Sequence, residues 1–142
     1  METISRKAKI LFIEDEMNMR FFLKTLLETN GFFPIMARNG REGLQLARKE
    51  LPEMILLDVM MPEQGGALTY VKIREDLDLR AIPVMILSGI AKQTFFHYLD
   101  MVNTGKTEKI PFPEAYIQKP PEPDHLLHWI QKIIHNKNHE TE

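Results

Sequence analysis

The chain alternates between short apolar runs and longer segments in which apolar residues recur at helical spacing. Runs such as 54–57 contain no polar residue, which is typical of strands that are covered on both faces. Pro34 lies inside another run and favours an edge position for it, because proline cannot donate to a strand ladder. The pattern predicts strands at 10–13, 32–37, 54–57, 84–87 and 116–118.

A segment with helical periodicity follows each predicted strand. The apolar positions that mark these helices are Met19, Phe22, Leu23, Leu26 and Leu27; Leu44, Ala47 and Leu51; Tyr70, Ile73 and Leu77; the segment 94–102; and Leu126, Trp129, Ile130 and Ile133. Strands that alternate with helices of this length indicate βαβ units and a parallel sheet. We therefore expect an α/β protein, a three-layer α/β/α sandwich around a five-stranded parallel sheet.

The composition narrows the class of protein. The chain has 142 residues, 44% of them apolar, which is enough for one domain with its own core. It has no cysteine, which excludes disulfides, thiol catalysis and cysteine-ligated metals. The net charge of −2 gives no basic excess that would indicate a nucleic-acid partner. No apolar run approaches a signal sequence or the ~20 residues of a membrane span, so we expect a cytoplasmic protein without membrane contact.

Polar residues follow four of the five predicted strands. Glu14 and Asp15 follow the first strand, Asp58 follows the third, Ser88 ends the fourth, and Lys119 follows the fifth. Because the carboxyl ends of parallel strands share one edge of an open sheet, where ligands bind, we expect these side chains to lie together. Each residue alone would be an ordinary cap or turn residue. Their occurrence at successive strand ends favours a functional site.

The residue types at this edge point to phosphoryl transfer. Three neighbouring carboxylates repel one another unless a cation joins them, and oxygen-only ligands suit Mg²⁺. Lys119 and Ser88 supply an ammonium and a hydroxyl, which hold an anion with several oxygens. A carboxylate, a divalent metal ion, a lysine and a hydroxyl together form a phosphoryl-transfer site with an aspartate nucleophile.

Four motifs, in this order, resemble the receiver domain of bacterial two-component response regulators. They are ILFIEDE at 10–16, ILLDVMMP at 55–62, VMILS at 84–88 and YIQKP at 116–120. The resemblance spans about residues 8–136, which leaves 137–142 as a polar tail of a single domain over 1–142. It implies a flavodoxin-like receiver fold with strand order 2-1-3-4-5.

The resemblance also assigns roles to the residues of the site. Asp58 would be the phosphoacceptor, which takes a phosphoryl group from a histidine kinase or a histidine phosphotransfer protein. Asp15 and Asp58 would bind Mg²⁺ directly, together with the backbone carbonyl of Met60, and Glu14 would act through water. Lys119 would pair with a phosphate oxygen.

A switch is implied beside this site. Ser88 would contact the phosphate only after phosphorylation, and Tyr116, which matches the family's switch aromatic, would rotate inward as Ser88 moves. This change would reshape a surface that an unknown downstream protein reads, and it is compatible with a weak homodimer. The resemblance further implies a cis Lys119-Pro120 bond and a signalling protein that catalyses only its own phosphorylation and dephosphorylation.

The chain departs from the family pattern over about residues 89–114. The segment is longer than the family norm by roughly two helical turns, ~7–9 residues. The part at 94–102 predicts an aromatic-rich helix, and 103–113 predicts a loop with two prolines and one glycine. Two interpretations stay open for the loop: a tolerated surface insertion, or a docking element for a specific partner. The resemblance implies that Met60 and Ile90 occupy positions that flank the path of the hydrolytic water. Both are bulky and apolar, so we expect a long-lived phosphoryl group.

Three other functions are considered. A Mg²⁺-dependent phosphohydrolase with an aspartate nucleophile commonly has a second aspartate two residues later, where this chain has Met60. A nucleotide- or flavin-binding domain would need a glycine- or hydroxyl-rich first loop, where this chain has Glu14, Asp15 and Glu16. A pseudo-receiver that never takes phosphate is disfavoured by the complete set of acceptor residues.

Overall fold

The sheet of this protein has five strands, all parallel. The computed structural model describes residues 6–59 and 65–140. The strands are β1 (Lys9–Ile13), β2 (Phe33–Ala37), β3 (Met54–Leu57), β4 (Val84–Ser88) and β5 (Ala115–Gln118). Their order is β2-β1-β3-β4-β5, so the expected topology is confirmed. β2 lies at an edge of the sheet, as Pro34 predicts.

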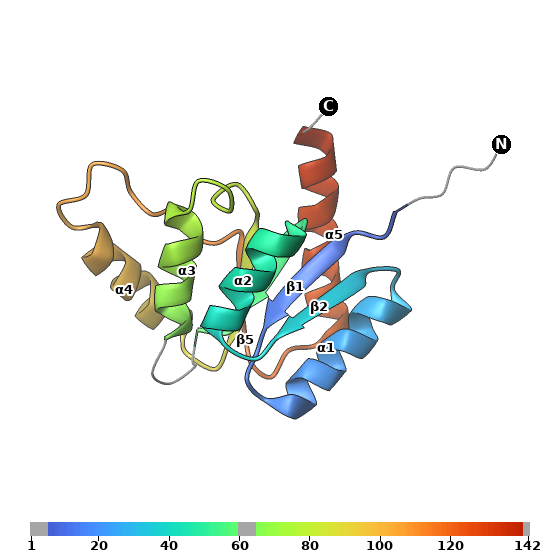
Figure 1. Cartoon of the computed structure of the whole chain (residues 1–142). Coiled ribbons are helices and arrows are strands. Elements are labelled where there is room, and N and C mark those ends of the chain that lie inside the picture. The colour runs from blue at the N-terminus through green and yellow to red at the C-terminus, as the bar shows by residue number, and fades with distance from the viewer. Residues whose placement is uncertain (1–5, 60–64, 141–142) are drawn as a thin grey trace.

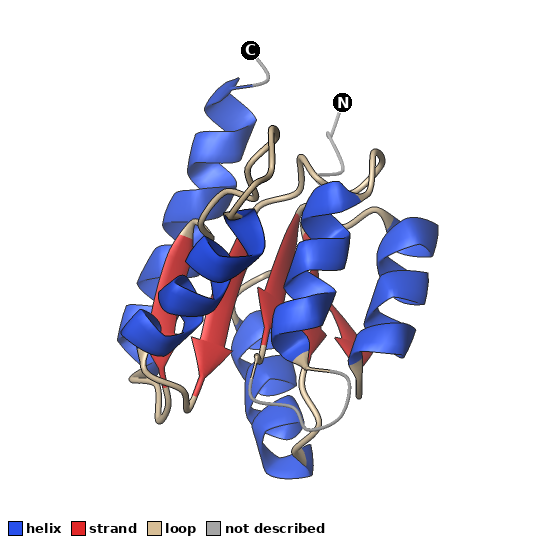
Figure 2. Ribbon diagram, turned by 90° about the vertical axis from the view of Figure 1, so that its left-hand side faces the viewer, coloured by secondary structure: helices blue, strands red, loops and turns tan. Residues whose placement is uncertain are grey.

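Helices cover both faces of the sheet (Figures 1 and 2). They are α1 (Met17–Thr29), α2 (Gly40–Glu50), α3 (Gly66–Glu75), α4 (Lys92–Asn103) and α5 (Pro123–Glu140). The apolar residues of α1 and α5 pack on one face, and those of α2, α3 and α4 pack on the other. The three-layer α/β/α architecture expected from the sequence is therefore present.

Alternate residues of each central strand enter the two cores. In β1, Leu11 and Ile13 join the core under α2, α3 and α4, whereas Ile10 and Phe12 join the core under α1 and α5. All four side chains are buried, which explains why these strands have no polar alternation. The first residues beyond the carboxyl ends of the strands form one rim of the sheet.

Two helices end earlier than their apolar periodicity predicts. α2 stops at Glu50, and Leu51 follows in the left-handed region with φ 46° and with 57% of its surface exposed. The helical conformation is disfavoured at Leu51 because Pro52 follows it. α3 stops at Glu75, and Leu77 is 78% exposed. Asp76 accepts a hydrogen bond from the Asp78 N–H and so closes a turn instead of another helical turn.

The segment after α4 is irregular, whereas the last described element is a long helix. α4 covers the predicted aromatic-rich helix, and residues 104–114 contain neither helix nor strand. α5 continues beyond the expected core limit at 136 and includes residues 137–140. Among the described helices, none combines the length and the apolar character that a bilayer span requires.

Candidate functional site

The strand-end residues lie at one edge of the sheet, as the parallel topology requires. Glu14 and Asp15 follow β1, Asp58 follows β3, and Lys119 follows β5, while Ser88 is the last residue of β4. Backbone hydrogen bonds extend the ladder to these positions. The Asp58 N–H donates to the Ile13 carbonyl at 3.1 Å, and the Lys119 N–H donates to the Ser88 carbonyl at 2.8 Å. The sheet itself therefore fixes where the site begins.

Three carboxylates meet at this edge. Oxygen atoms of Glu14, Asp15 and Asp58 all lie within 4.8 Å of one another. Glu14 and Asp58 are only 2% and 4% exposed, whereas Asp15 is open to solvent. The Lys119 ammonium lies between the two buried carboxylates, 2.7 Å from Glu14 Oε1 and 3.1 Å from Asp58 Oδ2. The site therefore holds a carboxylate cluster that is partly neutralised by one cation.

The pKa values of Glu14 and Lys119 are shifted by burial and by the contacts of these side chains. Burial raises the pKa of Glu14, and the hydrogen bond from Lys119 only partly offsets this effect. Burial also lowers the pKa of Lys119, but the hydrogen bond to Glu14 and the charge of Asp58 outweigh it, so the Lys119 pKa is raised. Lys119 is therefore firmly cationic at neutral pH.

Two residues that sequence reasoning did not select hold the loop between β1 and α1. The Arg20 guanidinium donates from Nη1 to the carbonyls of Glu14, at 3.1 Å, and Asp15, at 2.8 Å. The Glu16 side chain caps α1 by accepting from the Met19 N–H, and the Glu16 N–H donates to Glu14 Oε2. The capping pattern was visible in the sequence. The contact of Arg20 was not, because it depends on the position of α1 relative to the loop that precedes it.

A glycine lets α3 approach the acidic cluster. A methyl group at Gly66 would overlap the carbonyl oxygen of Asp58 and the Cα of Val59. The first turn of α3 therefore packs directly on the backbone of the central aspartate. The pair Gly65-Gly66 was visible in the sequence as a loop, but only the packing shows that the second glycine is required.

Ser88 and Tyr116 lie beside the loop between β4 and α4. The Ser88 side chain is fully buried, and its hydroxyl accepts from the Ile90 N–H at 3.2 Å. The half-buried Tyr116 hydroxyl donates to the Ile90 carbonyl at 2.6 Å. Burial raises the pKa of Tyr116, which stays a neutral donor. The Tyr116 hydroxyl thus contacts the loop after Ser88. The Lys119-Pro120 bond is cis, as expected.

The donor set fits Mg²⁺. Carboxylate oxygens from three residues converge within the range that one small cation bridges, and no sulfur or imidazole ligand accompanies them among residues 6–59 and 65–140. Mg²⁺ prefers such oxygen ligands and tolerates a site that is open on one side, as the exposure of Asp15 allows. Met60, whose carbonyl was expected to complete the ligand set, lies outside the described residues.

Comparison with known proteins identifies a family. The family model of the response regulator receiver domain matches residues 10–131. The chain is 36% identical over 114 residues to the polar-differentiation response regulator DivK of Brucella anthropi, which covers 78% of this chain and 83% of that protein. It is 32% identical over 135 residues to histidine kinase P4 of Formosa agariphila and 29% identical over 135 residues to a probable transcriptional regulator, ycf27, of Guillardia theta.

The matched region makes up very different shares of the relatives' own lengths. The match covers 95% of this chain in both longer relatives, but only 9% of histidine kinase P4 and 48% of ycf27. Among solved structures, a CheY-like receiver domain from Methanospirillum hungatei superposes with a TM-score of 0.79 at 24% identity, over 95% of this chain and 99% of that one. At this identity the superposition supports the fold alone.

Proposed function

This chain belongs to the response regulator receiver domain family of two-component systems, and on that basis we propose that Asp58 is its phosphoacceptor. A partner histidine kinase or histidine phosphotransfer protein would supply the phosphoryl group. The observation that carries the proposal is the Lys119 ammonium between Glu14 and Asp58, with Asp15 completing the cluster. This arrangement offers a nucleophile, a metal-binding carboxylate set and a cation for the transferred group.

The proposed step is a displacement at phosphorus. A carboxylate oxygen of Asp58 attacks the phosphorus of a phosphohistidine, an O–P bond forms, and the N–P bond breaks with its electron pair going to the imidazole. Asp58 thereby becomes an aspartyl phosphate. Lys119 is already in contact with Asp58, so its ammonium is in position to pair with an oxygen of the new phosphoryl group.

Glu14, Asp15 and Asp58 would hold Mg²⁺ in this site, and the ion when bound would neutralise the negative charge that gathers there. The chain's own residues supply the rest. Lys119 partly neutralises Glu14 and Asp58. Arg20 fixes the backbone that carries Glu14 and Asp15, and the close packing at Gly66 fixes that of Asp58. The Ser88 hydroxyl, which here accepts from the Ile90 N–H, would donate to the phosphoryl group after the loop beyond β4 adjusts.

We further propose that the protein is a signalling switch and not an enzyme that turns over a substrate. The phosphohydrolase alternative lacks the second aspartate that commonly follows the nucleophile by two residues, because this chain has Met60 at that position. A pseudo-receiver would not need the complete acceptor set that is present. The downstream partner and a cytoplasmic location stay predictions, as does a long-lived phosphoryl group.

The test is phosphorylation by a small acyl-phosphate donor with Mg²⁺, followed by intact mass. The wild type should gain one phosphoryl group, and Asp58→Asn should gain none. Asp78→Asn removes an exposed aspartate outside the site and should behave as the wild type. A wild type without an adduct, or an adduct that persists in Asp58→Asn, would contradict the proposal. Steady turnover of phosphomonoesters would instead support the hydrolase.

A further inference from the structure

The long segment between α4 and β5 is fastened to the body of the protein. Ile110, in the middle of the segment, is only 5% exposed and packs in the core under α2, α3 and α4. The Asn103 side chain holds its backbone on both sides, donating to the Ile110 carbonyl at 3.0 Å and accepting from the Ile110 N–H at 2.7 Å. The segment 104–114 is therefore a built part of the fold and not a loose insertion.

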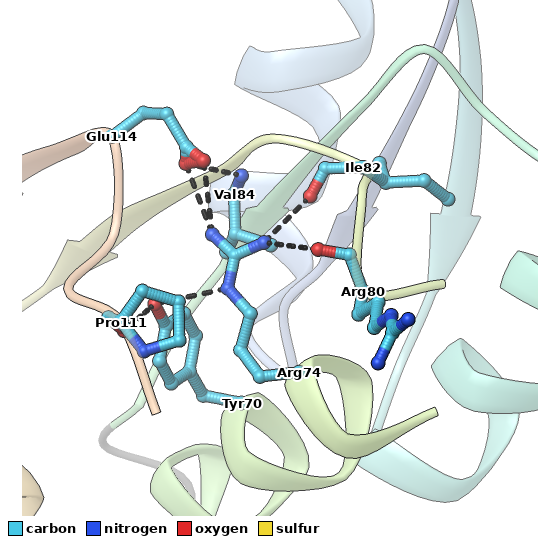
Figure 3. Close-up of polar contacts among 7 residues, drawn as sticks. All are labelled: Tyr70, Arg74, Arg80, Ile82, Val84, Pro111 and Glu114. Atoms are coloured by element: carbon cyan, nitrogen blue, oxygen red, sulfur yellow. Dashed lines mark hydrogen bonds and ion pairs between the residues drawn. The ribbon is translucent and has the colours of Figure 1, made fainter. Parts of the chain in front are cut away.

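Side chains of α3 also hold the segment 104–114 where it meets β5 (Figure 3). The Tyr70 hydroxyl of α3 donates to the Pro111 carbonyl at 2.6 Å. Arg74, one turn later on the same helix, donates from Nη2 to both carboxylate oxygens of Glu114 at 3.0 Å. These contacts from α3 fix the positions of residues 111 and 114 on either side of Phe112.

Phe112 uses this fixed position to cover an aromatic side chain of α4. Its ring stacks on Phe96 with a centroid distance of 4.5 Å and an interplanar angle of 1°. Phe112 itself stays 51% exposed, so one side of its ring faces solvent while the other covers Phe96. A stack of this kind has a preferred geometry and therefore restrains where the Phe96 ring can lie.

Phe96 in turn contacts Tyr116 on β5. The two rings meet edge to face, with a centroid distance of 6.2 Å and an angle of 82°. The Tyr116 hydroxyl donates to the Ile90 carbonyl, and the Ile90 N–H donates to the Ser88 hydroxyl. An unbroken series of contacts thus leads from Phe112 to Ser88, at the edge of the proposed phosphorylation site.

We propose that Phe112 is a positioning residue for that site: by stacking on Phe96 it holds Tyr116 against Ile90 and so orders the loop after β4, whose position sets where the Ser88 hydroxyl lies relative to the site. The inference rests on the proposed function, because it concerns the reaction of Asp58. It assigns a role to the long segment 104–114, which brings Phe112 to the aromatic cluster. Contact alone does not establish energetic coupling, so the test must measure a response at the site itself.

The first measurement is the rate of Asp58 phosphorylation by a small acyl-phosphate donor with Mg²⁺. Phe112→Ala should slow the reaction about two- to tenfold, the range expected when one aromatic pair is lost. Phe112→Tyr keeps the stacked ring and can place its hydroxyl in solvent, so it should restore the wild-type rate. The matched control is Phe33→Ala on β2, because Phe33 is also 51% exposed but lies on the edge strand remote from β5.

The second measurement reports on Tyr116 directly. With fluorotyrosine incorporated at the three tyrosines, the ¹⁹F resonance of Tyr116 is assigned by its loss in Tyr116→Phe. Phe112→Ala should shift or broaden this resonance, whereas Phe33→Ala should leave it unchanged. If Phe112→Ala does not fold, Phe112→Leu, which keeps apolar volume without the flat ring, should show the same two effects.

The outcomes separate the two proposals. A wild type that takes no phosphoryl group contradicts the proposed function. A wild type that is phosphorylated at the same rate as folded Phe112→Ala and Phe112→Leu overturns the positioning role and leaves the proposed function intact. Faster phosphorylation of these variants, or an equal effect of Phe33→Ala, overturns the positioning role as well.

Discussion

Lys119 is the residue on which the charge balance of the site depends. Its ammonium contacts Glu14 and Asp58, and Glu14 is almost completely removed from solvent. A buried carboxylate is costly without a partner. The same carboxylates are the proposed ligands of Mg²⁺, so Lys119 and the metal ion share one set of negative charges.

Replacing this lysine should have opposite effects on the free energy of unfolding and on metal affinity. Lys119→Gln should lower the metal-free stability by about 2 kcal/mol, because Glu14 loses its cation. The same variant should bind Mg²⁺ about three- to tenfold more tightly, because a neighbouring positive charge is gone. Urea unfolding and titration calorimetry measure the two quantities.

The control for this prediction is Lys49→Gln, which removes an exposed lysine of α2 outside the acidic cluster. It should change neither quantity. Weaker Mg²⁺ binding in Lys119→Gln would show that the lysine organises the carboxylates for the metal ion and does not compete with it.

At the scale of the elements, α3 is tied to its surroundings through Arg74. This buried guanidinium donates to five acceptor atoms: the Tyr70 hydroxyl, the Arg80 and Ile82 carbonyls, and both oxygens of Glu114. The residue therefore joins α3 to the start of β4 and to the start of β5 (Figure 3). Lysine cannot replace this set, because it has three donors and no planar fork.

The two partners of this contact should differ in their effect on stability. Arg74→Leu should lower the free energy of unfolding by about 3 kcal/mol, because two carbonyls and Glu114 lose their donor. Glu114→Gln should cost only about 1 kcal/mol, because its side chain is 36% exposed and still accepts hydrogen bonds. Urea unfolding of both variants gives the comparison, and a larger loss for Glu114→Gln would contradict it.

The elements also show what the sequence predicts and what it does not. The strands and their order followed from short apolar runs and from motif resemblance, and the strand-end residues followed from the rule that parallel strands share one edge. The helix ends at Leu51 and Leu77 did not follow, because Pro52 and the turn at Asp76 override apolar periodicity. Arg20, Arg74 and Gly66 act through contacts between distant segments, which a local pattern does not contain.

For the molecule as a whole, exposed apolar side chains lie near the acidic site. Met17 and Phe21, one turn apart at the start of α1, are each 71% exposed. α1 begins two residues after Asp15, so a protein that brings a phosphohistidine to Asp58 would meet this helix. Exposed large apolar side chains next to a reaction site are typical of a docking surface.

Removing this apolar contact should affect one kind of donor and not the other. Phe21→Ser should slow phosphorylation by a phosphohistidine donor protein about tenfold, as expected when an interface anchor is lost. It should leave phosphorylation by a small acyl phosphate unchanged, because the site itself is intact. The control is Leu77→Ser, which changes an apolar residue of comparable exposure beyond the end of α3. Equal slowing with both donors would place the defect in the site.

The two apolar cores have a consequence for how the strands find their partners. Because both faces of β1 and β3 are apolar, moving β3 along β1 by one residue would exchange the two faces at little cost in hydrophobicity. The same slip would carry Asp58 into the interior of the ladder beside Ile13, or draw Glu14 in beside Leu57. Desolvation of an unpaired carboxylate penalises either misalignment. The charges of the proposed site thus also help the folding chain to select its native pairing.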